Sequence, residues 1–164
     1  MLKKYWHLIF PVLMLALMVF IFCMSAQPAD DSSLTSSRFA TFAARHLLTN
    51  FWEFDKASQA KIIEGLTFIV RKGAHFSEYA LLAFLGYLWL HRIRFGSLIA
   101  FGAAVLYAAT DEFHQSFIPG RSCELRDVLV DSSGALCGLI AAFVLLSVLY
   151  CLLHKEVQQG GKWS

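Results

Sequence analysis

The stretch TDEFHQSFIPGR, residues 110–121, ends an otherwise apolar run with three ionisable side chains, those of Asp111, Glu112 and His114. An acidic side chain at the centre of a membrane helix costs roughly 2.5–3.5 kcal/mol, so such residues usually face a bundle interior or a polar cavity. The stretch therefore predicts an internal polar site near one end of a membrane helix.

The composition predicts an integral membrane protein. Hydrophobic residues make up 57% and charged residues only 16% of the 164 residues, whereas soluble domains contain about 25% charged residues. Four stretches can each supply the ~20 residues that a helix needs to cross a hydrocarbon core of about 30 Å. We expect one all-α domain over residues 1–164, a bundle of four transmembrane helices. The expected spans are residues 5–24, 66–90, 96–117 and 128–153, with an external loop over 25–65.

The first stretch also has features of a signal peptide, because Lys3 and Lys4 precede it and Ser25 and Ala26 follow it. Its apolar region of about 20 residues is longer than the usual 7–15, and Met24 is not the small residue expected before a cleavage site. We therefore interpret it as an uncleaved anchor.

Basic residues beside the spans predict the orientation. Lysines at both ends of the chain and two arginines between the second and third spans fall on one side of the membrane, which is then the cytoplasmic side. The opposite side holds eight basic residues, but four of these lie in the long external loop and the others in polar motifs. We expect a multi-pass protein of the cell membrane with both termini in the cytoplasm. The residues that predict this orientation are Lys3, Lys4, Arg92, Arg94, Lys155 and Lys162.

The segment between the first two spans is expected to contain a short helix in the membrane interface. Ser36 or Ser37 can cap this helix, and an apolar stripe along it consists of Phe39, Phe42, Ala43 and Leu47. Further on, Asp55 is expected to cap a second helix that leads into the second span.

The second span begins with a polar segment. On a helix, Lys72, His75 and Tyr79 lie along one face, and Arg71, His75 and Glu78 lie along an overlapping face. His75 is placed where the two faces meet, so this side of the helix is not expected to face lipid.

The third span places Asp111, His114 and Gln115 on one face. Glu112 is turned by about 100°, so the two neighbouring carboxylates are expected to have different partners.

The fourth span carries Asp127 and Asp131, followed on the same face by Gly134 and Gly138. Small residues at this spacing let another helix backbone approach closely. We therefore expect three helices to converge on one polar cluster.

The sequence thus predicts two groups of site residues. Pro119 and Gly120 form a turn that directs Arg121 toward the site. The candidate polar pocket consists of Lys72, His75, Glu78, Tyr79, Asp111, Glu112, His114, Gln115, Asp127 and Asp131. The candidate anion-binding residues are Arg71, Arg121 and Arg126, which we expect at the exposed outer rim of the bundle.

Several motifs together resemble the VanZ-like membrane proteins. These are RKxxHxxEY at residues 71–79, DExHQxxxPGR at 111–121, DxxxDxxGxxxG at 127–138, and Ser25-Ala26-Gln27 after the first span. The resemblance covers roughly residues 5–150. It implies a role in the bacterial cell envelope, with a link to resistance to the glycopeptide teicoplanin, but it supplies no reaction. Many relatives carry Asn where this chain has Asp131, so the resemblance does not require a charge there.

The residues leave several functions open. The carboxylates and imidazoles suit a divalent metal, although the metal-binding patterns are loose. A hydrolase or transferase could use His75 or His114 as base and Asp111 or Glu112 to orient it; no serine or cysteine stands out as a nucleophile.

The cations could instead bind an anionic lipid or glycan-linked headgroup, or only pair with the acidic residues to hold the helices together. A non-catalytic partner of envelope biosynthetic enzymes is a further reading. The sequence predicts the lipid bilayer as a partner, no nucleic acid and no cofactor.

Overall fold

The computed structural model describes residues 2–160, with side chains for residues 8–154. This part of the chain is helical and contains no β-strand, which confirms the all-α class. The helices are α1 (Leu2–Ser25), α2 (Ala29–Leu47), the 3₁₀ helix η1 (Phe51–Glu53), α3 (Lys56–Leu90), α4 (Gly96–Gln115) and α5 (Leu125–Gly160).

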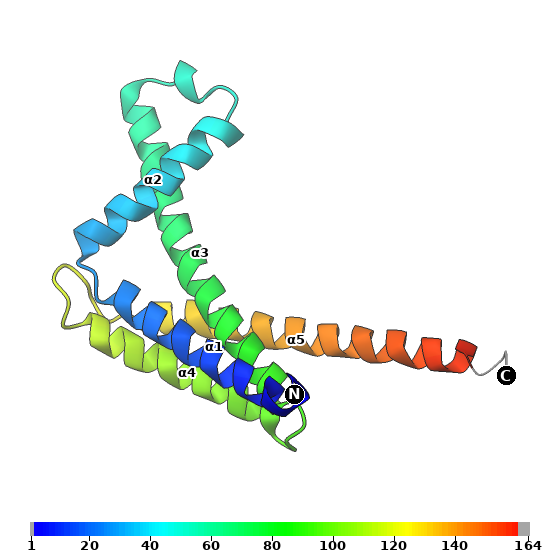
Figure 1. Cartoon of the computed structure of the whole chain (residues 1–164). Helices are drawn as coiled ribbons and strands as arrows, with labels where there is room; N and C mark the ends of the chain where they lie inside the picture. Colours follow the sequence, from blue (N-terminus) through cyan, green and yellow to red (C-terminus); the bar gives the residue numbers. More distant parts are fainter. Residues whose placement is uncertain (1, 161–164) are drawn as a thin grey trace.

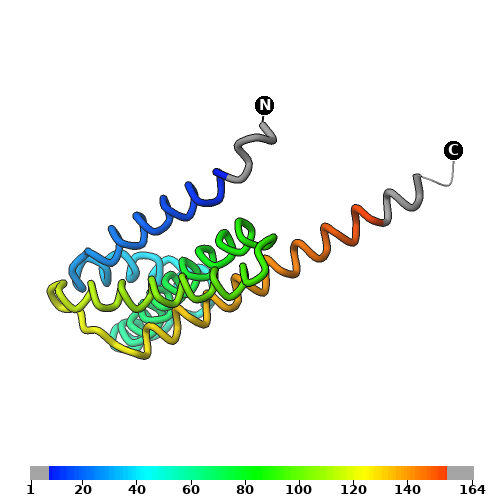
Figure 2. The backbone as a smooth tube through the Cα atoms, turned by 90° about the horizontal axis from the view of Figure 1, so that it is seen from below, coloured from blue at the N-terminus to red at the C-terminus, as the bar shows by residue number. Residues whose placement is uncertain are grey.

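The helices form a bundle with an arm. α1, α4 and the first half of α5 gather around the second half of α3, while α2 and the first half of α3 extend away from them and the second half of α5 projects on its own (Figures 1 and 2). We call this extension, residues 29–72, the arm. α3 belongs to both parts, so its residues near position 72 lie where the arm meets the bundle.

Two of the described helices are long and apolar enough to cross a membrane by length and composition. The apolar segments are Leu8–Ser25 in α1 and Leu125–His154 in α5, and only 11% of each segment is buried inside the structure. The polar residues near the start of the second span and the end of the third lower the mean hydropathy of α3 and α4. The four-span arrangement therefore stays a prediction.

α3 and α5 approach closely at the two glycines of the fourth predicted span. A Cβ atom on Gly134 would lie 2.2 Å from the carbonyl oxygen of Phe76, and one on Gly138 would lie 1.8 Å from that of Ala80. Both distances are far below van der Waals contact, so only glycine fits at these positions. The prediction that this face admits another helix backbone is confirmed.

The segment 25–65, predicted as an external loop, is largely helical. α2 begins after Pro28, so the prediction that Ser36 or Ser37 caps it is wrong. Asp30 and Asp31 in its first turn favour the earlier start, because acidic side chains stabilise helix N-termini.

The arm is held together by small residues. Ser36, Ala40 and Ala44 are buried along α2, whereas Phe39 and Phe42 of the predicted apolar stripe are exposed. Small side chains let α2 pack on α3 while its aromatic residues face outward.

The predicted cap of the helix after α2 is confirmed. The side chain of Asp55 accepts a hydrogen bond of 3.0 Å from the backbone N–H of Ser58 at the start of α3. The Ser58 side chain and then this backbone N–H lower the pKa of Asp55, because hydrogen bonding stabilises the ionised carboxylate.

The residues at the chain ends that predict the orientation, Lys3, Lys4, Lys155 and Lys162, lie outside the residues whose side chains are described.

Candidate functional site

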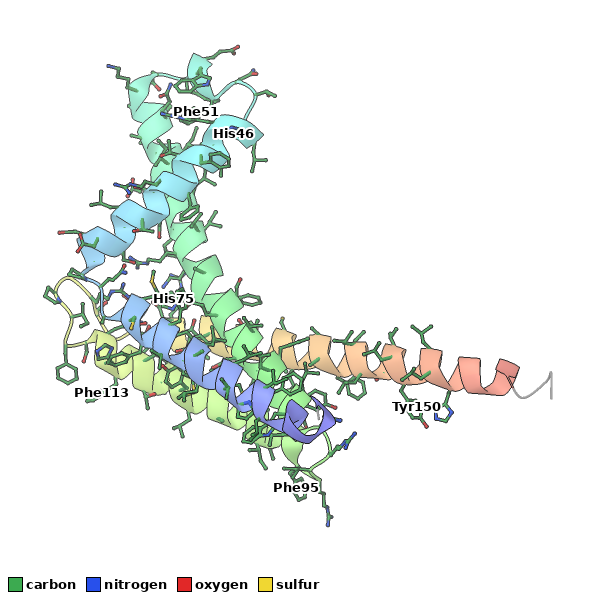
Figure 3. All side chains as sticks on the ribbon, viewed as in Figure 1. His46, Phe51, His75, Phe95, Phe113 and Tyr150 are labelled. Carbon is green, nitrogen blue, oxygen red and sulfur yellow. The ribbon has the colours of Figure 1, made fainter. Side chains whose placement is uncertain are left out.

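The site lies at the junction of the arm and the bundle, where the end of α4, the loop 116–124 and the start of α5 meet α3. His75 marks this junction (Figure 3). The residues of the site come from α1, α2, α3 and the continuous segment from the end of α4 to the start of α5, so the site exists only in the folded chain.

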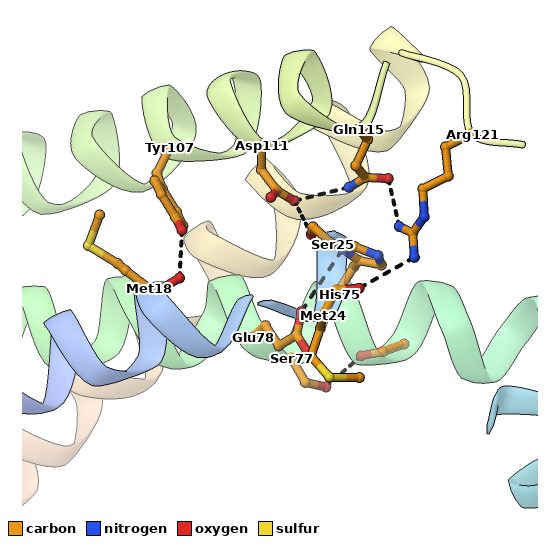
Figure 4. A network of polar contacts seen from close by, with 11 residues as sticks. Met18, Met24, Ser25, His75, Ser77, Glu78, Tyr107, Asp111, Gln115 and Arg121 are labelled. Atoms are coloured by element: carbon orange, nitrogen blue, oxygen red, sulfur yellow. Dashed lines mark hydrogen bonds and ion pairs between the residues drawn. The ribbon is translucent and has the colours of Figure 1, made fainter. Parts of the chain in front are cut away.

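Asp111 connects α4 to the end of α1. Its Oδ2 atom accepts hydrogen bonds from the Ser25 hydroxyl at 2.8 Å and from Gln115 Nε2 at 3.0 Å (Figure 4). Asp111, Ser25 and Gln115 are all buried. Both donors are neutral, so this carboxylate is held by hydrogen bonds and not by an ion pair.

Glu112 has a different partner, as its position on the helix predicts. Its Oε2 atom accepts a hydrogen bond of 3.1 Å from the backbone N–H of Glu124, directly before α5. The side chain is 1% exposed. Two adjacent acidic residues thus fix α4 to α1 on one side and to the start of α5 on the other.

Arg121 extends the Asp111 network into the loop. Its Nη1 donates to Gln115 Oε1 at 2.9 Å, its Nε to the carbonyl of Gln27 at 2.9 Å, and its Nη2 to the carbonyl of Met24 at 3.5 Å. The preceding Gly120 has a φ of 75°, a conformation that glycine adopts without strain. The predicted turn is therefore present.

Arg121 is half-buried. A residue at an exposed outer rim would be more accessible to solvent, so its predicted position at such a rim is wrong. Burial lowers the pKa of Arg121, and the nearby Arg71 guanidinium lowers it further. All three acceptors of Arg121 are neutral groups. Among the described residues, no carboxylate lies within ion-pair distance of the Arg71 or the Arg121 guanidinium.

Lys72 and Asp127 form an ion pair between α3 and α5. Both side chains are partly exposed, at 16% and 20%. The pair accounts for two of the predicted pocket residues, and it leaves Arg71, the neighbour of Lys72, without a carboxylate partner among the described residues.

Besides His114 Nδ1, four polar atoms of the predicted pocket are buried without a hydrogen-bond partner among the described residues. They are His75 Nδ1, Tyr79 OH, Asp111 Oδ1 and Asp131 Oδ2. His75 Nδ1 lies 4.0 Å from Glu78 Oε2, and Asp131 lies within electrostatic reach of Glu78 and Asp111. These side chains thus form one region of unsatisfied polar groups.

Two predicted residues lie apart from this region. The His114 ring stacks on Phe22 of α1, with 4.4 Å between ring centroids, and its Nδ1 atom has no partner in the described part of the chain. The Arg126 guanidinium is 5.8 Å from the Phe68 ring centroid, as in a cation–π contact.

Two small cavities adjoin at the junction. Each has a volume of about 60 Å³, and both are lined by Arg71, His75 and Arg121. The first continues toward Gln115 and the start of α5, and the second toward α2 and Glu78. We call them the α5 cavity and the α2 cavity.

The metal reading of the sequence gains no geometric support. Within the described residues, no three His, Cys, Asp or Glu side chains gather closely enough to hold a metal ion. The carboxylates of Asp111, Glu112 and Asp127 are instead directed to separate partners.

Some residues of the site were missed by reasoning from the sequence. Ser25 binds Asp111, Gln27 offers its backbone carbonyl to Arg121, and hydroxyl groups of α2 line the α2 cavity. The motif Ser25-Ala26-Gln27 was the available signal, but its contacts depend on how α1 meets the loop after α4.

The VanZ/LLP1 family model matches residues 10–150 of the chain, which confirms the resemblance predicted from the motifs. No curated protein and no solved structure matches the chain significantly.

Proposed function

The chain is a VanZ-like membrane protein of the VanZ/LLP1 family, and we propose that the cleft formed by the two cavities binds the anionic headgroup of an envelope lipid or of a glycan-linked lipid. Arginine is suited to this task, because its planar guanidinium donates hydrogen bonds in a geometry that matches phosphate oxygens.

The observation that carries this proposal is that Arg71 and Arg121 lie at the same cavities without a carboxylate partner among the described residues. The two guanidinium groups border the same cavities, and within the described residues neither has a carboxylate within ion-pair distance. Two neighbouring cations repel each other, so their arrangement is favourable when an anion lies between them. If the cations served only to hold the helices together, they would pair with carboxylates as Lys72 does.

We further propose four spans, with both termini in the cytoplasm and the cleft facing outward. α4 has 20 residues, which at 1.5 Å per residue corresponds to a hydrocarbon core of about 30 Å. Its acidic residues Asp111 and Glu112 are buried, and Glu78 of the second predicted span is half-buried, which reduces the cost of placing them in a membrane. An outward cleft is consistent with the expected envelope role and with a contribution to teicoplanin resistance.

Lipid retention tests the proposal. The full chain, purified in detergent, is incubated with an equimolar mixture of phosphatidylglycerol and phosphatidylcholine, and the bound lipid is quantified by native mass spectrometry. We expect phosphatidylglycerol to be preferred about tenfold, and Arg71→Ala to remove most of that preference.

Arg38→Ala is the matched control, because Arg38 is an exposed arginine of α2 that borders neither cavity. An equal retention of both lipids by the unmodified chain, or a loss in Arg38→Ala equal to that in Arg71→Ala, would contradict a specific headgroup site.

A second candidate function is hydrolysis of a phosphate ester in the same cleft. It is supported by His75, which borders both cavities and has Glu78 Oε2 4.0 Å from its Nδ1 atom. A carboxylate beside an imidazole can orient it as a general base. The pairs expected from the sequence, with Asp111 or Glu112 as the orienting group, are not hydrogen-bonded here. Release of phosphate from a phosphorylated lipid, abolished in His75→Gln, would favour this function.

A further inference from the structure

We infer that the ligand of the cleft carries a diphosphate, with one phosphoryl group in the α5 cavity and the other in the α2 cavity. This inference rests on the proposed headgroup site and specifies its ligand class.

The size and number of the cavities support a diphosphate. Each cavity has a volume of about 60 Å³, whereas a cavity that holds one water molecule needs about 10–15 Å³ in the same measure. This space admits a single phosphoryl group in each cavity. Two such cavities that share three lining residues match two phosphoryl groups joined by one bridging oxygen.

Arg121 has the donors needed to bind both groups. A guanidinium carries five N–H donors, and the three hydrogen bonds to Met24, Gln27 and Gln115 leave two of them available. Because these hydrogen bonds also fix the orientation of the side chain, little conformational entropy is lost when an anion binds. Arg71 borders both cavities with no partner among the described residues that would compete for it.

Acidic residues also border the cavities, and among them only Asp127 pairs with a Lys or Arg side chain of the described residues. Asp127 pairs with Lys72, Glu124 accepts a hydrogen bond of 2.9 Å from the Ser122 hydroxyl, and Glu78 lies beside His75. Arg71 and Arg121 are the cations that border both cavities without a carboxylate partner among the described residues, and a diphosphate diester carries two negative charges that match them.

Hydroxyl groups complete the α2 cavity. Ser32 and Ser36 line it, and neither hydroxyl makes a hydrogen bond with another described residue. Hydroxyl groups donate to phosphoryl oxygens. The α2 cavity therefore offers the second phosphoryl group neutral donors as well as the shared arginines.

Isothermal titration tests the inference with soluble probes. The full chain in detergent is titrated with inorganic phosphate and with methylenediphosphonate, whose P–C–P linkage resists hydrolysis. We expect methylenediphosphonate to bind at least about tenfold more tightly than phosphate. Arg71→Ala should remove that advantage, and Arg38→Ala should retain it.

Ser32→Leu is a second and more selective variant, because Ser32 lines the α2 cavity and not the α5 cavity. Filling the α2 cavity should reduce the affinity for methylenediphosphonate to that for phosphate and leave phosphate binding unchanged. It also provides a test if Arg71→Ala does not fold.

Equal affinities of the unmodified chain for the two probes would overturn the diphosphate inference and leave a single-anion site. Retention of phosphatidylglycerol without binding of methylenediphosphonate would also overturn it, while the proposed headgroup function would stand. Absence of both would overturn the headgroup function as well.

Discussion

Replacement of Gly138 by alanine should separate α3 from α5 and destabilise the bundle. The added Cβ atom would lie 1.8 Å from the carbonyl oxygen of Ala80, and to reach an ordinary contact of 3.4 Å the two backbones must move apart by about 1.6 Å. Because both contacting groups belong to helices, no flexible side chain can relieve the clash. Overpacking of this kind typically costs 1–3 kcal/mol.

The matched control is Gly102→Ala in α4, where an added Cβ atom has no neighbour within 4 Å. Alanine favours a helix over glycine by about 1 kcal/mol, and this gain is the same in both variants. The difference between them therefore isolates the helix contact. At about 2–4 °C per kcal/mol for a chain of this size, Gly138→Ala should melt about 2–12 °C below Gly102→Ala in a thermal unfolding assay in detergent. Equal melting temperatures would refute the close packing of α3 on α5.

Three further predictions concern the network, the hydrogen-bonded acid and the topology. Arg121→Ala removes three hydrogen bonds that a charged guanidinium donates, which should lower the free energy of unfolding by about 2 kcal/mol and the melting temperature by roughly 4–8 °C. An unchanged melting temperature would show that the loop does not depend on these hydrogen bonds. Asp111→Asn should lower the free energy of unfolding by about 1 kcal/mol, since an amide oxygen can still accept hydrogen bonds from the neutral donors. A decrease of about 3–5 kcal/mol in a denaturant titration would instead indicate a broken buried ion pair. Cys123, which is exposed in the loop after α4, should react with an impermeant thiol reagent on intact cells, whereas Arg94→Cys in a Cys123→Ser background should not; the reverse pattern would invert the proposed topology.

Helix periodicity predicted those features that depend on one helix or on two helices in contact. The separation of Asp111 from Glu112 follows from the 100° turn between adjacent residues, and the contact at Gly138 follows from the spacing of small residues along one face. The cap at Asp55 is a local interaction with Ser58 and needs no knowledge of the tertiary fold.

Features that depend on backbone acceptors or on an early helix start were not predictable in the same way. Arg121 binds the carbonyl groups of Met24 and Gln27, and every residue type presents the same carbonyl, so no sequence pattern marks such an acceptor. From sequence alone, Arg121 was therefore placed at an exposed rim. The start of α2 was misplaced because serine, a strong capping residue, lies inside this helix, where Ser36 is buried against α3.

The distribution of charge around the junction favours a ligand over a purely structural role. Asp111 and Glu112 are buried and take their hydrogen bonds from a hydroxyl, an amide and a backbone N–H, so they require no cation. Arg121 in turn donates to neutral acceptors, and Arg71 borders open space. Carboxylates and arginines that lie this close would satisfy each other if the fold needed only internal pairing. Their separation leaves Arg71 and Arg121 at the mouth of the cleft without carboxylate partners among the described residues, which supports the proposed anionic ligand.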